Sequence, residues 1–285
     1  MPELPEVQAL AESLDESLRG ATVQEVVIRS VAALKTYDPP VEALRGLTIT
    51  GVRRVGKFID IEVAPLHLVV HLARAGWLRL RAQPTNARPA LRGPLVMVVR
   101  LGDRGALEAT EQGTEKRLAI YLVRDLEQVA GIARLGVDAL AEDLTAARLG
   151  ESLRAQSGTL KNVLADQAVI AGIGNAYSDE ILHAARLSPF RKAAGLDAEE
   201  VARLHTEMRA VLSDAVGRAR TADPAELRGD KKLRMRVHGR TGEPCPVCGD
   251  VIRQVSYTSR SFQYCATCQT GGKVHADRRL SRLLR

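Results

Sequence analysis

The 285-residue sequence lacks the features that would direct it to or through a membrane. No stretch approaches the roughly 20 consecutive apolar residues that a membrane-spanning helix needs. The start, with Pro2 and Glu3, shows no basic segment followed by an apolar run, so a signal peptide is not indicated. Internal repeats and low-complexity stretches are also missing. We therefore expect a cytoplasmic protein with no membrane partner.

Cysteine is scarce, and its four copies form two Cys-x-x-Cys pairs separated by sixteen residues: Cys245, Cys248, Cys265 and Cys268. Two such pairs can close a tetrahedral thiolate site around Zn²⁺. Two disulfides are an alternative, but nothing here indicates an oxidising compartment. A redox motif, the other alternative, does not come doubled in this way. We expect one structural zinc ion, because four protein ligands leave no open position for a substrate.

The segment between the cysteine pairs alternates polar and apolar residues like a β-hairpin. The cysteine-rich unit is therefore predicted to be a zinc ribbon that presents Arg253 and Arg260. By itself, such a ribbon indicates nucleic-acid or protein binding and no more.

Positive charge is concentrated at the end of the chain. The net charge is +7, and residues 236–285 hold nine basic and three acidic residues, which gives +6. Such a concentration suggests a polyanionic partner. A solubilising tail would explain the charge equally well.

The order of the predicted elements favours an α+β multidomain protein. Alternating and β-branched runs predict strands near 22–30, 57–63, 66–72 and 94–101, after an opening helix that Gly20 ends. Residues from about 140 to 220 are predicted to be helical, with Asp197 and Glu200 as a capping pair. Strands followed by helices indicate separate modules rather than a βαβ sheet.

Three segments carry a resemblance to a known family: MPELPEV at the start, AGIGNAYSDEIL at 171–182, and the terminal cysteine ribbon. In this order they resemble the formamidopyrimidine-DNA glycosylase and endonuclease VIII family over nearly the whole chain. Supporting matches are GKF at 56–58, RLGVDAL at 134–140 and VHGRTGEPC at 237–245.

The resemblance implies four parts. They are an N-terminal β-sandwich flanked by helices (2–133), a helix–two-turn–helix domain (134–235), a zinc-ribbon finger (236–270) and a basic tail (271–285). It also implies a monomer that binds double-stranded DNA containing a damaged base or abasic site, and that associates with the nucleoid in this way.

The same resemblance makes Pro2 the nucleophile once Met1 is removed. An α-amine has a reference pKa near ~8, against ~10.4 for lysine, so more of it is neutral at pH 7. A secondary amine can form a cationic iminium with the sugar C1′, as in other amine-based covalent catalysis. Glu3 is implied to protonate the deoxyribose ring oxygen, with Glu6 one turn further. Without the motif, a proline and two acidic residues would only indicate a helix N-terminus.

Three further residues match family positions. Lys57, in GKF, is implied to donate a proton in β-elimination and to contact phosphate. Arg260 is implied to act in δ-elimination, and its guanidinium suits a bidentate phosphate contact. Asn175 ends a Gly-x-Gly turn whose backbone amides could approach a DNA phosphate, although Asn is also an ordinary helix cap.

The base-recognition positions depart from the family pattern. Arg74 stands where the family has a methionine that fills the gap left by the flipped base. Arg117 matches a second gap-filling residue, whereas Leu118 replaces an aromatic wedge. Arg92 is a possible substitute for a histidine expected near position 90. Selectivity for a flipped base depends on pocket shape and edge contacts, so the lesion is left open.

We therefore predict a bifunctional DNA glycosylase and abasic-site lyase that excises oxidised or ring-opened bases through a Pro2 Schiff base and β/δ-elimination. Arg74, Arg117, Asn175 and Arg260 are the predicted DNA contacts. The alternatives are a lesion-binding protein without turnover and a lyase that acts on abasic sites only.

Overall fold

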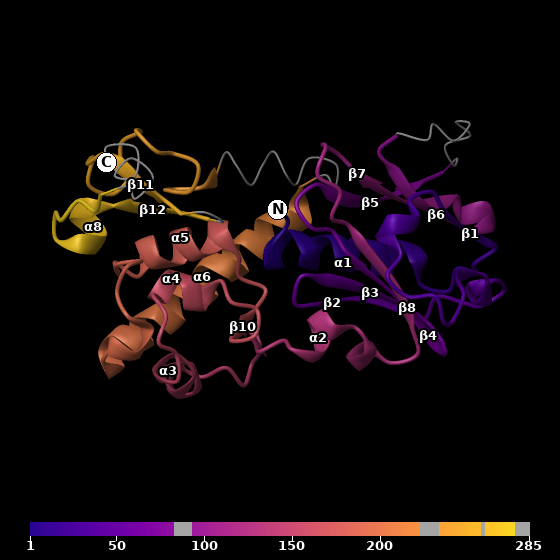
Figure 1. Cartoon of the computed structure of the whole chain (residues 1–285), viewed down its shortest axis with the longest axis horizontal. Helices are drawn as coiled ribbons and strands as arrows, with labels where there is room; N and C mark the ends of the chain where they lie inside the picture. Colours follow the sequence, from indigo (N-terminus) through magenta and orange to yellow (C-terminus); the bar gives the residue numbers. More distant parts are fainter. Residues whose placement is uncertain (83–92, 223–233, 258–259, 277–285) are drawn as a thin grey trace. The chain divides into compact units, whose positions relative to one another are not determined.

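The computed structural model describes all residues except 83–92, 223–233, 258–259 and 277–285 (Figure 1). Arg92 and most of the predicted basic tail lie outside the described residues. The chain forms two compact units. Unit 1 comprises Met1–Arg134 with Ala219–Ala225, and unit 2 comprises Leu135–Arg218 with Glu226–Arg285.

Unit 1 begins with helix α1 (Leu4–Leu18), which packs on strand β2 (Gly51–Val55) (Figure 1). Pro5 lies in the first turn, where its missing N–H costs nothing because that N–H would have no helical partner. Leu4, Val7, Leu10, Leu14 and Leu18 are buried along one face. The chain then leaves the helix through Gly20 at φ +80°, which confirms the predicted end.

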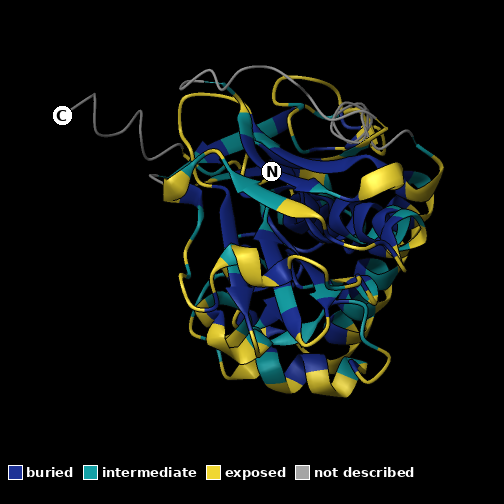
Figure 2. Cartoon of the chain, turned by 90° about the vertical axis from the view of Figure 1, so that its right-hand side faces the viewer, coloured by how far each residue is buried: buried dark blue, intermediate teal, exposed yellow. Residues whose placement is uncertain are grey.

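Two antiparallel four-stranded sheets form most of the rest of unit 1. The order of one is β1-β6-β7-β5, and that of the other is β2-β3-β4-β8. The further strands of unit 1 are β1 (Glu25–Ile28), β3 (Phe58–Val63), β4 (Leu66–His71), β5 (Gly76–Arg81), β6 (Leu95–Arg100), β7 (Ala106–Glu111) and β8 (Ala119–Val123). Their central residues are mostly buried, and exposed residues concentrate in the connections (Figure 2). The four strands predicted from sequence are present, and each end lies within three residues of the predicted one.

The short helices of unit 1 lie between strands or follow them. They are η1 (Val31–Ala33), η2 (Val41–Leu44), η3 (Gly102–Arg104), η4 (Leu126–Gln128) and α2 (Ala130–Ala133).

Unit 2 holds the predicted helices. They are α3 (Ala146–Arg154), α4 (Leu160–Leu164), α5 (Asn175–Ala184), η5 (Ala193–Gly195) and α6 (Ala198–Thr221), the last of which ends among the residues grouped with unit 1. Before α6, Asp197 and Glu200 each accept the other's backbone N–H, so the predicted capping pair is confirmed. Between α4 and α5, Ile170–Ala171 (β10) pairs in parallel with Val137–Asp138 (β9). These two-residue strands are too short for a sequence period to reveal.

The end of unit 2 is the predicted ribbon. Strands β11 (Ile252–Ser256) and β12 (Ser261–Cys265) pair antiparallel, and helix α8 (Ala266–Thr270) follows directly. Together with the sheets of unit 1 and the helices of unit 2, the ribbon confirms the predicted α+β class. Among the described residues, no helix has the length and apolar character needed to span a membrane.

Candidate functional site

The start of α1 buries the predicted catalytic carboxylate. Pro2 and Glu3 are buried, Glu3 with only 2% of its surface exposed, whereas Met1 lies at the surface. Glu6 Oε2 accepts the backbone N–H of Glu3 at 2.8 Å, which belongs to a capping box at the helix N-terminus. The helix therefore fixes the backbone on which Pro2 and Glu3 sit.

Lys57 lies on the β2–β3 turn, as predicted, but it is not a solvated surface lysine: only 6% of it is exposed. Gly56 precedes it at φ +59°, a conformation that glycine adopts without strain. From the end of β2, Arg54 donates to the Gly56 carbonyl at 3.0 Å and to Gln8 Oε1 of α1 at 2.7 Å. The turn that carries Lys57 is thus tied to the helix that carries Glu3.

His71, which sequence reasoning missed, belongs to the same region of unit 1. It ends β4 opposite Phe58, and the two rings lie 4.7 Å apart between centroids. Burial, with a smaller contribution from the charge of Lys57, lowers the pKa of His71 to about 4. The imidazole is therefore neutral at pH 7 and can donate or accept one hydrogen bond beside a lysine. A histidine at the end of an apolar strand was the available signal.

Two exposed arginines lie on neighbouring loops of unit 1. Arg74 occupies the turn between β4 and β5, and Arg117 lies before β8. Their side chains are 64% and 63% exposed and share one partner, Glu115 Oε2, at 3.8 and 3.3 Å respectively. Two predicted gap-filling residues are thus brought together around one carboxylate.

The loop that carries Arg117 is held by a buried carboxylate. Glu111 Oε1, at the end of β7, accepts the backbone N–H groups of Arg117 at 2.7 Å and Leu118 at 2.9 Å. Leu118 is only 2% exposed, and its Cδ1 would lie 2.7 Å from a Cβ on Gly76. Leu118 therefore packs inside unit 1, and a surface wedge is not what this structure shows.

In unit 2 the Gly-rich turn before α5 is braced by Gln167, another residue that the sequence did not single out. Its amide accepts the N–H of Gly172 at 3.0 Å and donates to the carbonyls of Ile173 at 2.6 Å and Ala165 at 3.1 Å. Asn175 is the first residue of α5 rather than its cap, which is Gly174. Its buried Oδ1 has no hydrogen-bond partner among the described residues.

Arg260 is exposed at the β11–β12 turn, as predicted. Its guanidinium donates to Asn162 Oδ1 at 3.3 Å. The neighbouring Lys161 is fully buried and donates to the Ser261 carbonyl and to Asp179 Oδ1, both at 2.5 Å. Helix α4 therefore contacts Arg260 and the residue that follows it.

Helix α5 fastens the ribbon through two buried carboxylates. Asp179 also accepts the backbone N–H of Gln263 at 3.1 Å and contacts His238 Nδ1 at 2.8 Å. Glu180 accepts three consecutive backbone N–H groups, those of residues 236–238, at 2.8–2.9 Å. Burial raises the pKa of Glu180 although these N–H groups oppose the shift. Residues 56–84 positions apart in the chain are joined here.

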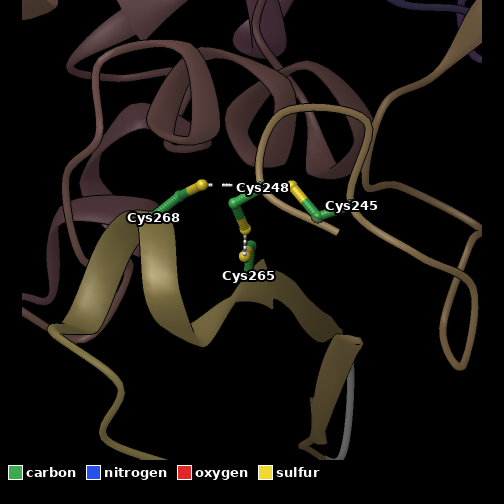
Figure 3. A group of neighbouring side chains, drawn as sticks. All are labelled: Cys245, Cys248, Cys265 and Cys268. Atoms are coloured by element: carbon green, nitrogen blue, oxygen red, sulfur yellow. Dashed lines mark hydrogen bonds between the residues drawn. The ribbon is translucent and has the colours of Figure 1, made fainter. Parts of the chain in front are cut away.

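The four cysteines converge from two segments (Figure 3). Cys245 and Cys248 lie on the loop before β11, Cys265 ends β12, and Cys268 lies in α8. Their sulfurs all lie within 4.8 Å of one another, with Cys248–Cys265 at 3.4 Å and Cys245–Cys268 at 3.9 Å, and all four are free thiols.

This geometry fits a metal ion. A tetrahedral site with Zn–S bonds of about 2.3 Å places its sulfurs about 3.8 Å apart, close to the two separations given above. Burial raises the pKa of Cys265 to about 11 and also raises that of Cys268, so without a cation these thiols stay protonated. A bound cation would displace those protons. The cluster can hold a metal ion, as the spacing predicted.

Comparison with known proteins covers both units. Residues 1–127 match the formamidopyrimidine-DNA glycosylase N-terminal domain, and residues 135–223 match the formamidopyrimidine-DNA glycosylase H2TH domain. The formamidopyrimidine-DNA glycosylase of Symbiobacterium thermophilum is 34% identical over 276 residues, which is 94% of this chain and 89% of that protein. An uncharacterized formamidopyrimidine-DNA glycosylase-like protein of Mycobacterium tuberculosis is 56% identical over 151 residues, 53% of this chain and 94% of that protein.

Solved structures give the same result. The formamidopyrimidine-DNA glycosylase of Thermus thermophilus superposes with a TM-score of 0.82 at 32% identity, covering 96% of this chain and all of that one. The Lactococcus lactis enzyme in complex with DNA that contains an abasic site gives 0.83 at 25% identity, covering 94% and 99% of the two chains.

Proposed function

Because the chain belongs to the formamidopyrimidine-DNA glycosylase family, we propose that it removes damaged bases from double-stranded DNA and cleaves the resulting abasic sites. The family, the fold class and the enzyme class expected from the sequence are confirmed. The identity of the attacking groups goes further, and it is supported by the geometry of unit 1; the damaged base stays open.

The observation that carries the proposal is the burial of Pro2 and Glu3 at the start of α1, with the Lys57 turn tied to the same helix. A carboxylate that is buried at the chain start and fixed by a capping box is positioned, whereas a surface glutamate would be mobile. Positioning of this kind is what general acid catalysis and covalent catalysis require.

In the proposed reaction, removal of Met1 frees the Pro2 nitrogen, which attacks C1′ of the damaged nucleotide. The bond from C1′ to the base breaks, and the base leaves with a proton. Glu3 protonates the ring oxygen as the sugar opens, which leaves a cationic iminium between Pro2 and C1′. The iminium withdraws electrons, so loss of a C2′ proton expels the 3′-phosphate. Hydrolysis of the iminium then releases Pro2.

Lys57, Arg260, Asn175, Arg74 and Arg117 complete the proposal. Lys57 supplies a cation and protons at the sugar and phosphate, with neutral His71 as its neighbour in unit 1. Arg260 contacts phosphate and serves the second elimination, and Asn175 offers an amide at a helix N-terminus. Arg74 and Arg117 contact DNA around the flipped nucleotide. Because the resemblance implies a methionine at position 74, the choice of lesion stays the open part of the function.

We further propose that the ion in the cysteine cluster is Zn²⁺, held by Cys245, Cys248, Cys265 and Cys268. Four thiolates favour this soft, redox-inert cation, which would stabilise the ribbon and so support Arg260. The protein is proposed to act as a monomer with the parts 2–133, 134–235, 236–270 and 271–285.

The test is a panel of duplexes, each with one defined lesion or an abasic site, scored separately for base release and for strand cleavage. Base release coupled to cleavage on at least one lesion is the expected result. Cleavage of abasic sites alone would replace the proposal with an abasic-site lyase. Binding without either product would replace it with a lesion-binding protein, an interpretation that the departures at Arg74 and Leu118 permit.

A further inference from the structure

We propose that His183 is part of the metal centre: its imidazole N–H donates to the thiolate of Cys245, and this hydrogen bond holds the metal and fastens the ribbon to α5. The proposal rests on the metal ion proposed above. His183 could not be selected by the spacing of the four cysteines, which identifies only the cysteines themselves.

The contact itself is the first observation. His183 lies in the last turn of α5, is 2% exposed, and places Nε2 3.3 Å from Cys245 Sγ across 62 positions of the chain. A metal-bound thiolate carries no proton, so the shared hydrogen must come from the imidazole. The tautomer is thereby fixed with the proton on Nε2.

The other sulfurs show why Cys245 needs this donor. Backbone N–H groups favour the thiolate form of two other cysteines: that of Asp250 lowers the pKa of Cys248, and that of Cys268 opposes the rise that burial causes in the pKa of Cys265. Cys245 and Cys265 both lie in an apolar cluster with Val237 and Ile252. A negative sulfur in such surroundings is costly without a donor. At Cys245 the imidazole side chain of His183 supplies the N–H that the backbone supplies at Cys248 and Cys265.

Two features set the imidazole apart from an ordinary packed histidine. Its Nδ1 is buried and has no hydrogen-bond partner among the described residues, so only the sulfur contact holds the ring by polar means. A cavity of about 240 Å³ is lined by His183 and Cys268, with Arg186 and Arg236 at its sides, but Cys245 does not line it. His183 therefore contacts Cys245 and also borders a cavity that reaches the cluster at Cys268.

Outer-shell partners of this kind orient a ligand and lower its charge density, and their loss typically costs about 10- to 100-fold in metal affinity. We expect His183→Phe, which keeps a ring of similar volume without a donor, to lose affinity for Zn²⁺ by that factor. His183→Gln, whose amide retains an N–H donor, should recover much of the loss. The matched control is His205→Phe, because His205 also makes a part-buried contact within unit 2, to the Leu144 carbonyl at 2.6 Å, but does not touch the cluster.

The experiment uses the full chain loaded with Zn²⁺ and follows metal transfer to a competing chromogenic chelator, together with the sulfur-to-metal charge-transfer band of the Co²⁺-substituted protein. In His183→Phe we expect the chelator to compete more effectively and the charge-transfer band to lie at lower energy, because a thiolate without its hydrogen bond donates charge more readily. His205→Phe should match the wild type in both. Equal affinity and an unshifted band in His183→Phe would overturn the inference.

Two further outcomes separate loss of the N–H donor from loss of ring packing, and failure of the inference from failure of the metal site. If His183→Gln behaves as His183→Phe although both melt like His205→Phe, ring packing rather than N–H donation is responsible and the inference fails. If the wild type itself binds neither Zn²⁺ nor Co²⁺, the proposed metal fails together with the inference. Wild-type binding with no effect of His183→Phe removes the inference alone.

Discussion

Unit 1 contains two regions of opposite character. Pro2, Glu3 and Lys57 are buried, and hydrogen bonds tie the helix and the turn that carry them. Arg74 and Arg117 are mostly exposed and are joined only through the exposed Glu115. In the first region the sequence carries the residues that the resemblance implies, whereas in the second Arg117 follows the expected pattern and Arg74 departs from it. A buried, hydrogen-bonded group is costly to change, but an exposed ion pair contributes about 0–1 kcal/mol and can be replaced with little loss of stability.

The comparison thus separates the chemistry on the sugar from the choice of base. In the proposed mechanism, the chemistry on the sugar depends on groups whose positions the fold determines, and the choice of base depends on side chains that are exposed to solvent. Four predictions test this difference, and they are given in order of expected effect.

Glu3→Gln should cause the largest loss. The amide keeps the size of the side chain but cannot supply the acid proton, so single-turnover base release should fall by about 10²- to 10⁴-fold. Glu12→Gln is the control, because Glu12 lies on the same helix and pairs with Arg220 at 2.6 Å instead. Base release that falls equally in both variants would mean that a weakened α1, rather than lost acid catalysis, is responsible.

Glu111→Ala should lower stability more than the neighbouring substitution Glu115→Ala. It leaves the N–H groups of Arg117 and Leu118 without their acceptor, which should lower the free energy of unfolding by about 1–3 kcal/mol. Glu115→Ala removes only an exposed pair and should cost about 0–1 kcal/mol. Denaturant titration of both variants measures the difference, and equal losses would contradict the division between buried support and exposed arginines.

Arg74→Ala and Arg117→Ala should leave stability unchanged and act on DNA binding. If each arginine contacts a phosphate, each substitution should reduce the slope of log Kd against log salt by about 1. Arg74→Met, which restores the family residue, separates charge from shape: it should share the lowered slope. Unchanged slopes in all three variants would show that neither arginine neutralises DNA charge.

The smallest effect concerns the protonation of His71. Its folded pKa of about 4 is below the value of an exposed histidine, so the associated stability is full above about pH 6.5 and falls as pH drops toward 4. Replacing Lys57 by Met removes the smaller cause, and the pKa should rise without reaching 6.5 because burial persists. The pKa of His71 in both proteins is measured from its imidazole resonances by NMR during a pH titration. An equal pKa in the two proteins would show that Lys57 lies too far away to affect it.

Sequence patterns predicted the elements whose signal is local. Alternation located β3, β4 and β6, the Asp197–Glu200 pair located the start of α6, and cysteine spacing located the cluster that can hold a metal ion. The burial of Lys57 could not be read from one lysine in a turn motif. Nor could the contacts of Lys161 with Asp179 or of His183 with Cys245, because each joins residues that only the packing of helices brings together.

Departures from the family pattern were predicted by position but not by environment. The sequence alone showed that Leu118 occupies the position of the family's aromatic wedge. Its burial against Gly76, however, depends on how the loop packs on β5. The shared partner of Arg74 and Arg117 was likewise invisible, because Glu115 lies 41 positions from Arg74. Exposed loops are where a family motif says least about side-chain surroundings.

The central claim, attack by the Pro2 amine, is tested most directly by borohydride trapping on abasic-site DNA with matched preparations of free and blocked N-terminus. Protein with a free Pro2 amine should give a covalent protein–DNA complex. Protein in which Pro2 is acetylated, or in which Met1 is retained, should give none. Circular dichroism and DNA binding of the blocked protein establish that it remains folded and binds. A blocked protein that traps as efficiently as the free one would contradict the Pro2 mechanism.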